Sequence, residues 1–120
     1  MLRLTEDLRY YFYTGKVSLR RGCASLCGVI TTEMSSDPRD ERNCYIFMNA
    51  SRTILRMIRY ERGFFIMYEK RPSTGRFRKP VYDARAGRLR IPYSDLVCLS
   101  EGLVRTDIRL SESSLDTQKK

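Results

Sequence analysis

Basic side chains are concentrated in one stretch of this sequence, from position 70 to position 90. Phe77 and Tyr82 lie among them, and Asp83 is the single acidic residue of the stretch. Closely spaced guanidinium and ammonium groups suit contacts with a phosphate backbone, so the chemistry indicated is polyanion binding. The basic residues are Lys70, Arg71, Arg76, Arg78, Lys79, Arg85, Arg88 and Arg90.

Two pairs of arginines in this stretch alternate with apolar residues, as in a strand. Alternation puts Arg76 and Arg78 on one face, and it puts Arg88 and Arg90 together on a face of their own strand. If the two strands are neighbours in a hairpin, the four guanidiniums meet one surface. The alternative is a solvated edge hairpin whose charges prevent aggregation.

A second basic pair, Arg20 and Arg21, follows Ser18, which is a suitable N-cap for a helix. We therefore expect the pair in the first helical turn. Cations there are disfavoured by the helix dipole by some tenths of a kcal/mol, which hints at an acidic partner or a phosphate. The alternative is an ordinary solvated helix surface.

The charge of the whole chain supports a nucleic-acid partner. The 23 Lys and Arg residues outnumber the 14 Asp and Glu residues, for a formal charge of +9. Arginine makes up most of the basic residues, and its planar fork of donors matches phosphate better than the lysine ammonium does. General solubility charge is the competing explanation, and it would not favour arginine so strongly.

The composition argues against catalysis and against a bound metal or cofactor. The chain has no His, which removes most hydrolytic triads and His-metal nucleases, and its four Cys form no CxxC pair. A nuclease with carboxylate-held metal stays open as an alternative, with Glu61, Glu69 and Asp83 as the candidate ligands. Turn positions and neighbouring arginines explain these acids more simply. We expect a protein that is not an enzyme.

The N-terminus lacks the apolar stretch of a signal peptide, and no run of residues is long enough to span a membrane. We therefore expect a cytoplasmic protein without a membrane partner, with reduced thiols.

Periodicity predicts a single α+β domain over residues 10–110, after an N-terminal arm (1–9) and before a disordered tail (111–120). An apolar stripe at steps of three and four predicts one long helix at 19–34, and a short helix follows Pro92. Short connections predict an antiparallel meander sheet of about five or six strands. The expected strands are 9–13, 44–49, 53–61, 64–71, 76–78 and 88–91.

From position 10 to position 102 the chain resembles the small accessory protein (TnpB) that the second open reading frame of insertion-sequence-66 transposable elements encodes. The resemblance is carried by segments in a fixed order and spacing. They are Tyr13-Thr14-Gly15-Lys16-Val17-Ser18-Leu19-Arg20-Arg21-Gly22, Ile46-Phe47-Met48-Asn49, Tyr60-Glu61-Arg62-Gly63-Phe64-Phe65, Tyr68-Glu69-Lys70-Arg71, Gly75-Arg76-Phe77-Arg78-Lys79-Pro80 and Leu99-Ser100-Glu101-Gly102.

This resemblance implies a bacterial mobile element, a nucleoid-associated protein that cooperates with a separate transposase, and no established catalytic residues. The family usually has Trp where this chain has Lys79, which puts any stacking role there in doubt and adds positive charge. The expected function is accessory: binding DNA, in particular the element ends, or the transposase. A protein adaptor without direct DNA binding and an RNA-binding module remain alternatives, and homo-oligomerisation is left open. The expected contact residues are Arg20, Arg21, Lys70, Arg71, Arg76, Arg78, Lys79, Arg88 and Arg90.

Overall fold

The computed structural model describes residues 4–82, 87–101 and 108–109 of the chain. The predicted tail therefore lies outside the described residues, as do Asp83 and Arg85. The described residues form two helices and seven strands. They are β1 (Arg9–Tyr13), α1 (Cys23–Thr32), β2 (Asn43–Met48), β3 (Leu55–Glu61), β4 (Phe64–Lys70), β5 (Pro80–Val81), β6 (Arg88–Ile91), α2 (Tyr93–Glu101) and β7 (Ile108–Arg109).

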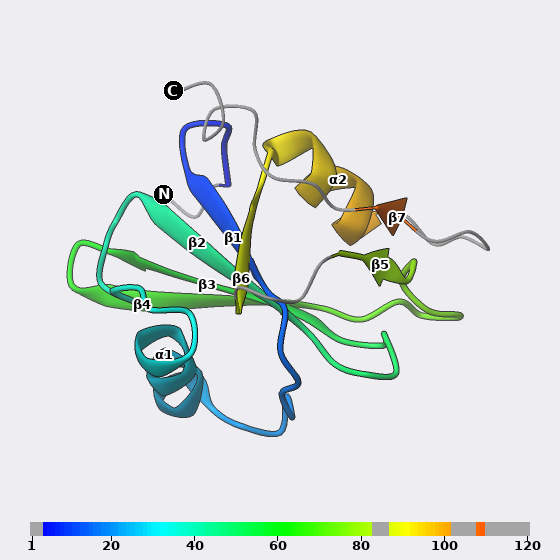
Figure 1. Cartoon of the computed structure of the whole chain (residues 1–120), viewed down its shortest axis with the longest axis horizontal. Helices are drawn as coiled ribbons and strands as arrows, with labels where there is room; N and C mark the ends of the chain where they lie inside the picture. Colours follow the sequence, from blue (N-terminus) through cyan, green and yellow to red (C-terminus); the bar gives the residue numbers. More distant parts are fainter. Residues whose placement is uncertain (1–3, 83–86, 102–107, 110–120) are drawn as a thin grey trace.

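Five strands form one twisted sheet in the order β4-β3-β2-β1-β6 (Figure 1). The class α+β is confirmed, but the purely antiparallel meander is wrong, because β1 and β2 are parallel, with Tyr11 opposite Tyr45. The chain between these two strands contains α1 and is long enough for the crossover that parallel strands require. The meander prediction holds for β2, β3 and β4, whose connections are short.

The first helix is shorter than predicted, with ten residues instead of sixteen. Gly22 is its N-cap and has extended backbone, so Arg20 and Arg21 precede the helix instead of forming its first turn. The Ser18 hydroxyl accepts a long hydrogen bond (3.4 Å) from the Arg20 backbone N–H and caps a turn. Leu19 and Met34, at the two ends of the predicted stripe, are buried but lie outside the helix. The apolar spacing therefore predicted correctly that these residues are buried, but it overestimated the length of the helix.

The two helices cover opposite faces of the sheet, with α1 below it and α2 above it in Figure 1. Alternation along β3 sends Ile58 to the core under α1 and sends Leu55 and Met57 to the core under α2. The α1 core is completed by Leu26 and Ile30 of the helix. Each helix therefore buries one apolar face of the sheet, and the segments that connect the strands lie at the two ends of the sheet.

The predicted strand at 76–78 is absent, because residues 71–79 have no regular structure. Phe77 is buried in the core under α2 with 2% of its surface exposed, and it fixes this segment against the sheet. The chain then enters β5, which pairs with β7 in a separate two-stranded sheet. The strand predicted at 88–91 is confirmed as β6, and the short helix after Pro92 is confirmed as α2.

Candidate nucleic-acid interface

The sheet has two ends that differ in charge. At one end β1, β2 and β4 finish and β3 and β6 begin, since Met48 pairs with Leu55 and Tyr13 pairs with Arg88. We call this the basic end, and it comprises the connecting segments 14–22, 49–54 and 71–79. The opposite end comprises segments 4–8, 37–42 and 62–63.

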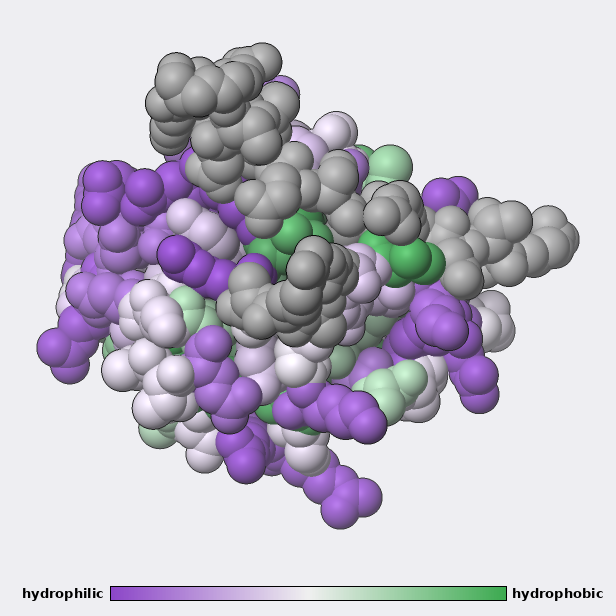
Figure 2. Space-filling model, viewed as in Figure 1, coloured by the Kyte–Doolittle hydropathy of each residue, from purple (hydrophilic) through white to green (hydrophobic). Residues whose placement is uncertain are grey.

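The connecting segments of the basic end contain eight basic residues and no acidic residue. Those of the opposite end contain five acidic and three basic residues among the described positions. Figure 2 shows hydrophilic residues over both ends of the molecule, so the difference between the ends is one of charge sign. The eight residues of the basic end are Lys16, Arg20, Arg21, Arg52, Arg71, Arg76, Arg78 and Lys79.

Part of the basic end is fixed by a buried arginine of β3. Arg56, with 7% of its surface exposed, donates from Nη1 to the backbone carbonyl oxygen of Arg21 at 2.8 Å. Its Nε donates to the Glu69 carboxylate at 3.0 Å, and Arg71 donates to the other oxygen of that carboxylate at 2.7 Å. Hydrogen bonds from Arg71 and Arg56 lower the pKa of Glu69. The cluster therefore joins the segment before α1 to the end of β4 and keeps an excess of positive charge.

A second set of contacts holds segments 49–54 and 71–79 together. The backbone N–H of Phe77 donates to the carbonyl oxygen of Arg52 at 2.9 Å, and the Arg52 guanidinium donates back to the carbonyl oxygen of Phe77 at 3.2 Å. Phe77 points into the core, and its neighbours Arg76 and Arg78 are exposed and half-buried respectively. Within the described part of the chain, the Arg78 Nε atom is buried without a hydrogen-bond partner.

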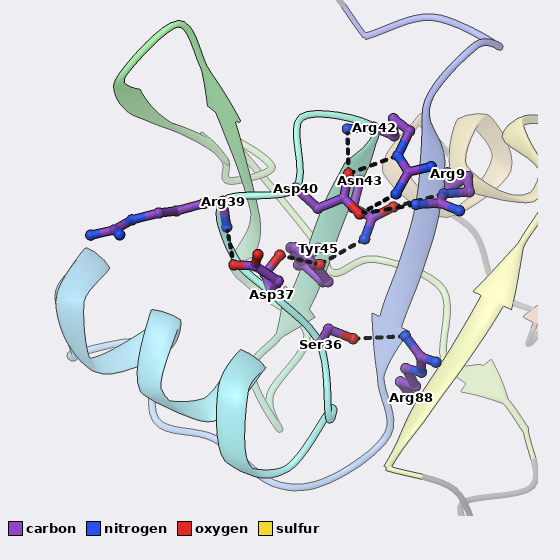
Figure 3. Close-up of polar contacts among 9 residues, drawn as sticks. All are labelled: Arg9, Ser36, Asp37, Arg39, Asp40, Arg42, Asn43, Tyr45 and Arg88. Atoms are coloured by element: carbon purple, nitrogen blue, oxygen red, sulfur yellow. Dashed lines mark hydrogen bonds and ion pairs between the residues drawn. The ribbon is translucent and has the colours of Figure 1, made fainter.

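At the opposite end Asp40 binds the side chains of two arginines (Figure 3). Asp40 accepts hydrogen bonds from the Arg42 guanidinium at 2.9 Å and from the Arg9 guanidinium at 3.1 Å. These contacts, with those from Arg42 the strongest, lower the pKa of Asp40 to about 2. In the basic end, by contrast, Arg71 alone of the eight residues forms an ion pair with another described residue. Seven of the eight basic side chains of the basic end therefore have no ion pair with another described residue, whereas acids outnumber bases in the segments of the opposite end.

Six of the nine predicted contact residues lie in the basic end. The structure brings them together from segments before α1 and after β4. The six residues are Arg20, Arg21, Arg71, Arg76, Arg78 and Lys79.

The other three predicted residues lie in strands β4 and β6, outside these connecting segments. Lys70 donates to Glu101 at 2.7 Å and to the carbonyl oxygen of Ser100 at 2.8 Å, so it ties β4 to α2. Arg88 and Arg90 do share a face, but it is the face that α1 covers. Arg88 donates to the Ser36 hydroxyl at 2.7 Å (Figure 3). Its guanidinium also lies over the Tyr11 ring, and Arg90 is buried.

Sequence reasoning missed Lys16 and Arg52. Both lie in short connections that the predicted stretch of 70–90 does not include. Segments 14–22 and 49–54 follow β1 and β2, and these strands end at the same end of the sheet because they are parallel. Lys16 and Arg52 could have been identified only if this parallel pairing had been predicted.

The two described carboxylates that were considered for a metal site, Glu61 and Glu69, lie at opposite ends of the sheet. Glu69 is occupied by two arginines at the basic end, and Glu61 lies at the far end of β3. Asp83 is outside the described residues. Among the positions that the structure describes, no group of three or more Cys, Asp or Glu could hold a metal ion, and no helix is long and apolar enough to cross a membrane.

The fold and the charge distribution together define a small α+β protein with one strongly cationic end. Residues 8–110 match a family model described as IS66 Orf2 like protein, so the chain belongs to the IS66 Orf2-like family of accessory proteins of transposition. The resemblance noted from the sequence is thereby confirmed. The family is generally without known catalytic activity. No curated protein and no solved structure matches the chain.

Proposed function

We propose that this accessory protein binds DNA through the basic end of its sheet. The observation that carries the proposal is the separation of charge: eight basic and no acidic residues in the segments of one end, against an acidic excess at the other. Neutralising DNA phosphates with such residues releases condensed counterions and gives affinity without sequence recognition. The element ends are the natural DNA target of a transposition protein, and the bacterial cytoplasm is the expected location.

Salt dependence of binding tests this proposal directly. About five phosphate contacts would make the logarithm of the association constant fall with the logarithm of salt concentration at a slope of about −4.5. Fluorescence anisotropy of a labelled duplex, measured at several salt concentrations, gives this slope. Including an RNA duplex of the same sequence separates DNA binding from the RNA alternative. Absence of duplex binding, or a slope near zero, would refute the proposal.

A second candidate function, binding of the transposase protein, is favoured by strand β4. β4 lies at the edge of the sheet, and Phe64 (72%), Phe65 (39%) and Met67 (41%) expose these fractions of their surfaces. No Pro or charged residue interrupts the stretch from 64 to 68. Natural edge strands usually carry such features to prevent pairing with other chains. An apolar strand of the transposase would pair with β4 through backbone hydrogen bonds and extend the sheet by one strand.

Capture of the transposase after nuclease treatment tests this second function. Met67→Lys places a charge on the β4 edge and should abolish capture while the basic end still binds DNA. A double variant of the basic end, Arg76→Gln with Lys79→Gln, should retain capture. Equal capture by Met67→Lys and the unchanged protein would refute a role for the β4 edge.

A further inference from the structure

A pocket opens at the basic end, where the parallel strands β1 and β2 finish. It has a volume of about 400 Å³, within the range of small-ligand sites. Crevices outside the carboxyl ends of parallel strands are common ligand sites in open sheets. Tyr13 ends β1 and Met48 ends β2, and both line the pocket.

The rim of the pocket is cationic. Lys16, Arg52 and Lys79 line it from three separate chain segments, and its described lining includes no carboxylate. Lys16 and Lys79 are exposed, and Arg52 is held by its hydrogen bond to the carbonyl oxygen of Phe77. Like charges brought together in this way repel one another, and a bound anion such as a phosphate removes the repulsion.

The wall of the pocket is apolar and aromatic. Val17, Met48 and Pro80 contribute aliphatic surface, and Tyr82 adds a ring that packs against Phe12 with centroids 5.4 Å apart. An aromatic and aliphatic wall suits the face of a nucleobase. A duplex keeps its bases stacked and paired, so the pocket can accept a base only when it is unpaired.

The Tyr13 ring, which lines the pocket, packs closely against the loop after β1. A Cβ atom at Gly15 would lie 2.4 Å from the Tyr13 hydroxyl oxygen, so only glycine lets the ring lie along the loop. The same hydroxyl donates to the carboxylate of Glu33, which follows α1 and fixes the ring. The pocket is therefore supported by the crossover between the parallel strands.

We infer that this pocket binds one unpaired nucleotide, its phosphate at Lys16, Arg52 and Lys79 and its base against Tyr82 and the aliphatic wall. The inference rests on the proposed DNA binding, because the pocket is continuous with the basic end. A DNA duplex with a short single-stranded overhang would place its backbone on the basic end and its unpaired nucleotide in the pocket. A free mononucleotide carries the same chemistry without the duplex contacts.

The test compares a blunt duplex, the same duplex with a three-nucleotide overhang, and a free deoxynucleoside monophosphate as competitor. One stacked base changes affinity by a factor of about ten, so the overhang should bind about tenfold tighter than the blunt duplex. Millimolar mononucleotide should remove this preference and leave blunt-duplex binding. If the mononucleotide competes equally with both duplexes, the pocket is not specific for the unpaired end and the inference fails.

Two variants locate the effect. Lys79→Met removes a rim charge at an exposed position, and Val17→Phe fills the pocket without changing charge. Each should reduce the overhang preference to less than about twofold, and Arg62→Met at the opposite end should keep it. Lys79→Met keeps the test decisive if Val17→Phe does not fold.

Equal affinity of the unchanged protein for blunt and overhang duplexes would overturn the pocket inference and leave the proposed function standing. A preference that survives in both folded variants would also overturn it. If no duplex binds at all, the proposed function fails first, and the pocket inference fails with it.

Discussion

The guanidinium of Arg56 lies 2.8 Å from the backbone carbonyl oxygen of Arg21 and donates a hydrogen bond to it. Arg56 is buried in β3, whereas Arg21 is an exposed residue of the basic end. A buried cation thus positions an exposed one, with Glu69 providing the compensating carboxylate. Arg56 therefore both contributes to the stability of the fold and holds a segment of the basic end in place.

Replacement of Arg56 by Met should destabilise the fold by about 3 kcal/mol, since it leaves the Arg21 carbonyl oxygen and part of the Glu69 carboxylate without their buried donor. The free energy of unfolding in urea measures this loss. Arg71→Met is the matched control, because Arg71 contacts the same carboxylate from an exposed position and should cost less than about 1 kcal/mol. Equal losses for the two variants would show that burial of Arg56 is unimportant.

Two glycine substitutions should change stability in opposite directions. Gly87 has a φ of +71°, and a Cβ atom there would lie 2.5 Å from the backbone carbonyl oxygen of Glu33, so Gly87→Ala should cost more than about 1 kcal/mol. Gly28 lies inside α1 with open space around its Cα, so Gly28→Ala should stabilise by about 0.5–1 kcal/mol. Thermal unfolding of both variants checks the pair. A stabilising Gly87→Ala would contradict the close packing of Gly87 against the end of α1.

Asp40 should contribute to stability at neutral pH and cease to do so in acid. Its pKa falls from 3.8 to about 2 on folding, because Arg42 and Arg9 bind the charged form. A lowered folded-state pKa gives stability that is present above the unfolded value and is lost as the pH falls from about 4 towards 2. Asp40→Asn should therefore melt at a lower temperature than the unchanged protein at pH 7. Melting temperatures between pH 7 and pH 2 should converge; a constant difference would contradict this account.

The cysteines should differ sharply in reactivity. Burial raises the pKa of Cys44 to about 12, and burial together with the neighbouring Cys23 raises that of Cys27 to about 11. A thiol with a pKa near 12 has about a thousandfold less thiolate at pH 8 than an unperturbed one, so it reacts slowly. Cys98 is exposed on α2 and should be alkylated first. Mass spectrometry after a short alkylation locates the label; early labelling of Cys44 in the folded protein would contradict its position in the core.

Local sequence patterns predicted the five strands of the main sheet well because each of them has one face or both faces in a core, but they predicted a strand at 76–78 that is absent and did not predict β5 and β7. β3 alternates between Ile58 under α1 and Met57 under α2, and this period of two is visible in the sequence. The length of α1 was not predictable from the same rule. Leu19 and Met34 continue the apolar spacing but are buried by the turns on either side of the helix.

The site was predictable only in part, for a related reason. Charge density along the sequence identified Arg76, Arg78 and Lys79, but the same rule included Arg88, which lies under α1 beside Ser36. Lys16 lies in the basic end because β1 and β2 are parallel and finish at the same end of the sheet. This pairing joins residues far apart in the sequence, so counting charges along the chain cannot detect it.

The most direct test of DNA binding at the basic end compares two double variants that remove the same charge from opposite ends of the sheet. Arg76→Gln with Lys79→Gln alters the basic end, and Arg39→Gln with Arg62→Asn alters exposed positions of the opposite end. Duplex affinity at fixed salt should fall at least about tenfold for the first variant, with a salt slope shallower by about two, and should change less than about twofold for the second. Equal losses in the two variants, or a larger loss at the opposite end, would contradict the account.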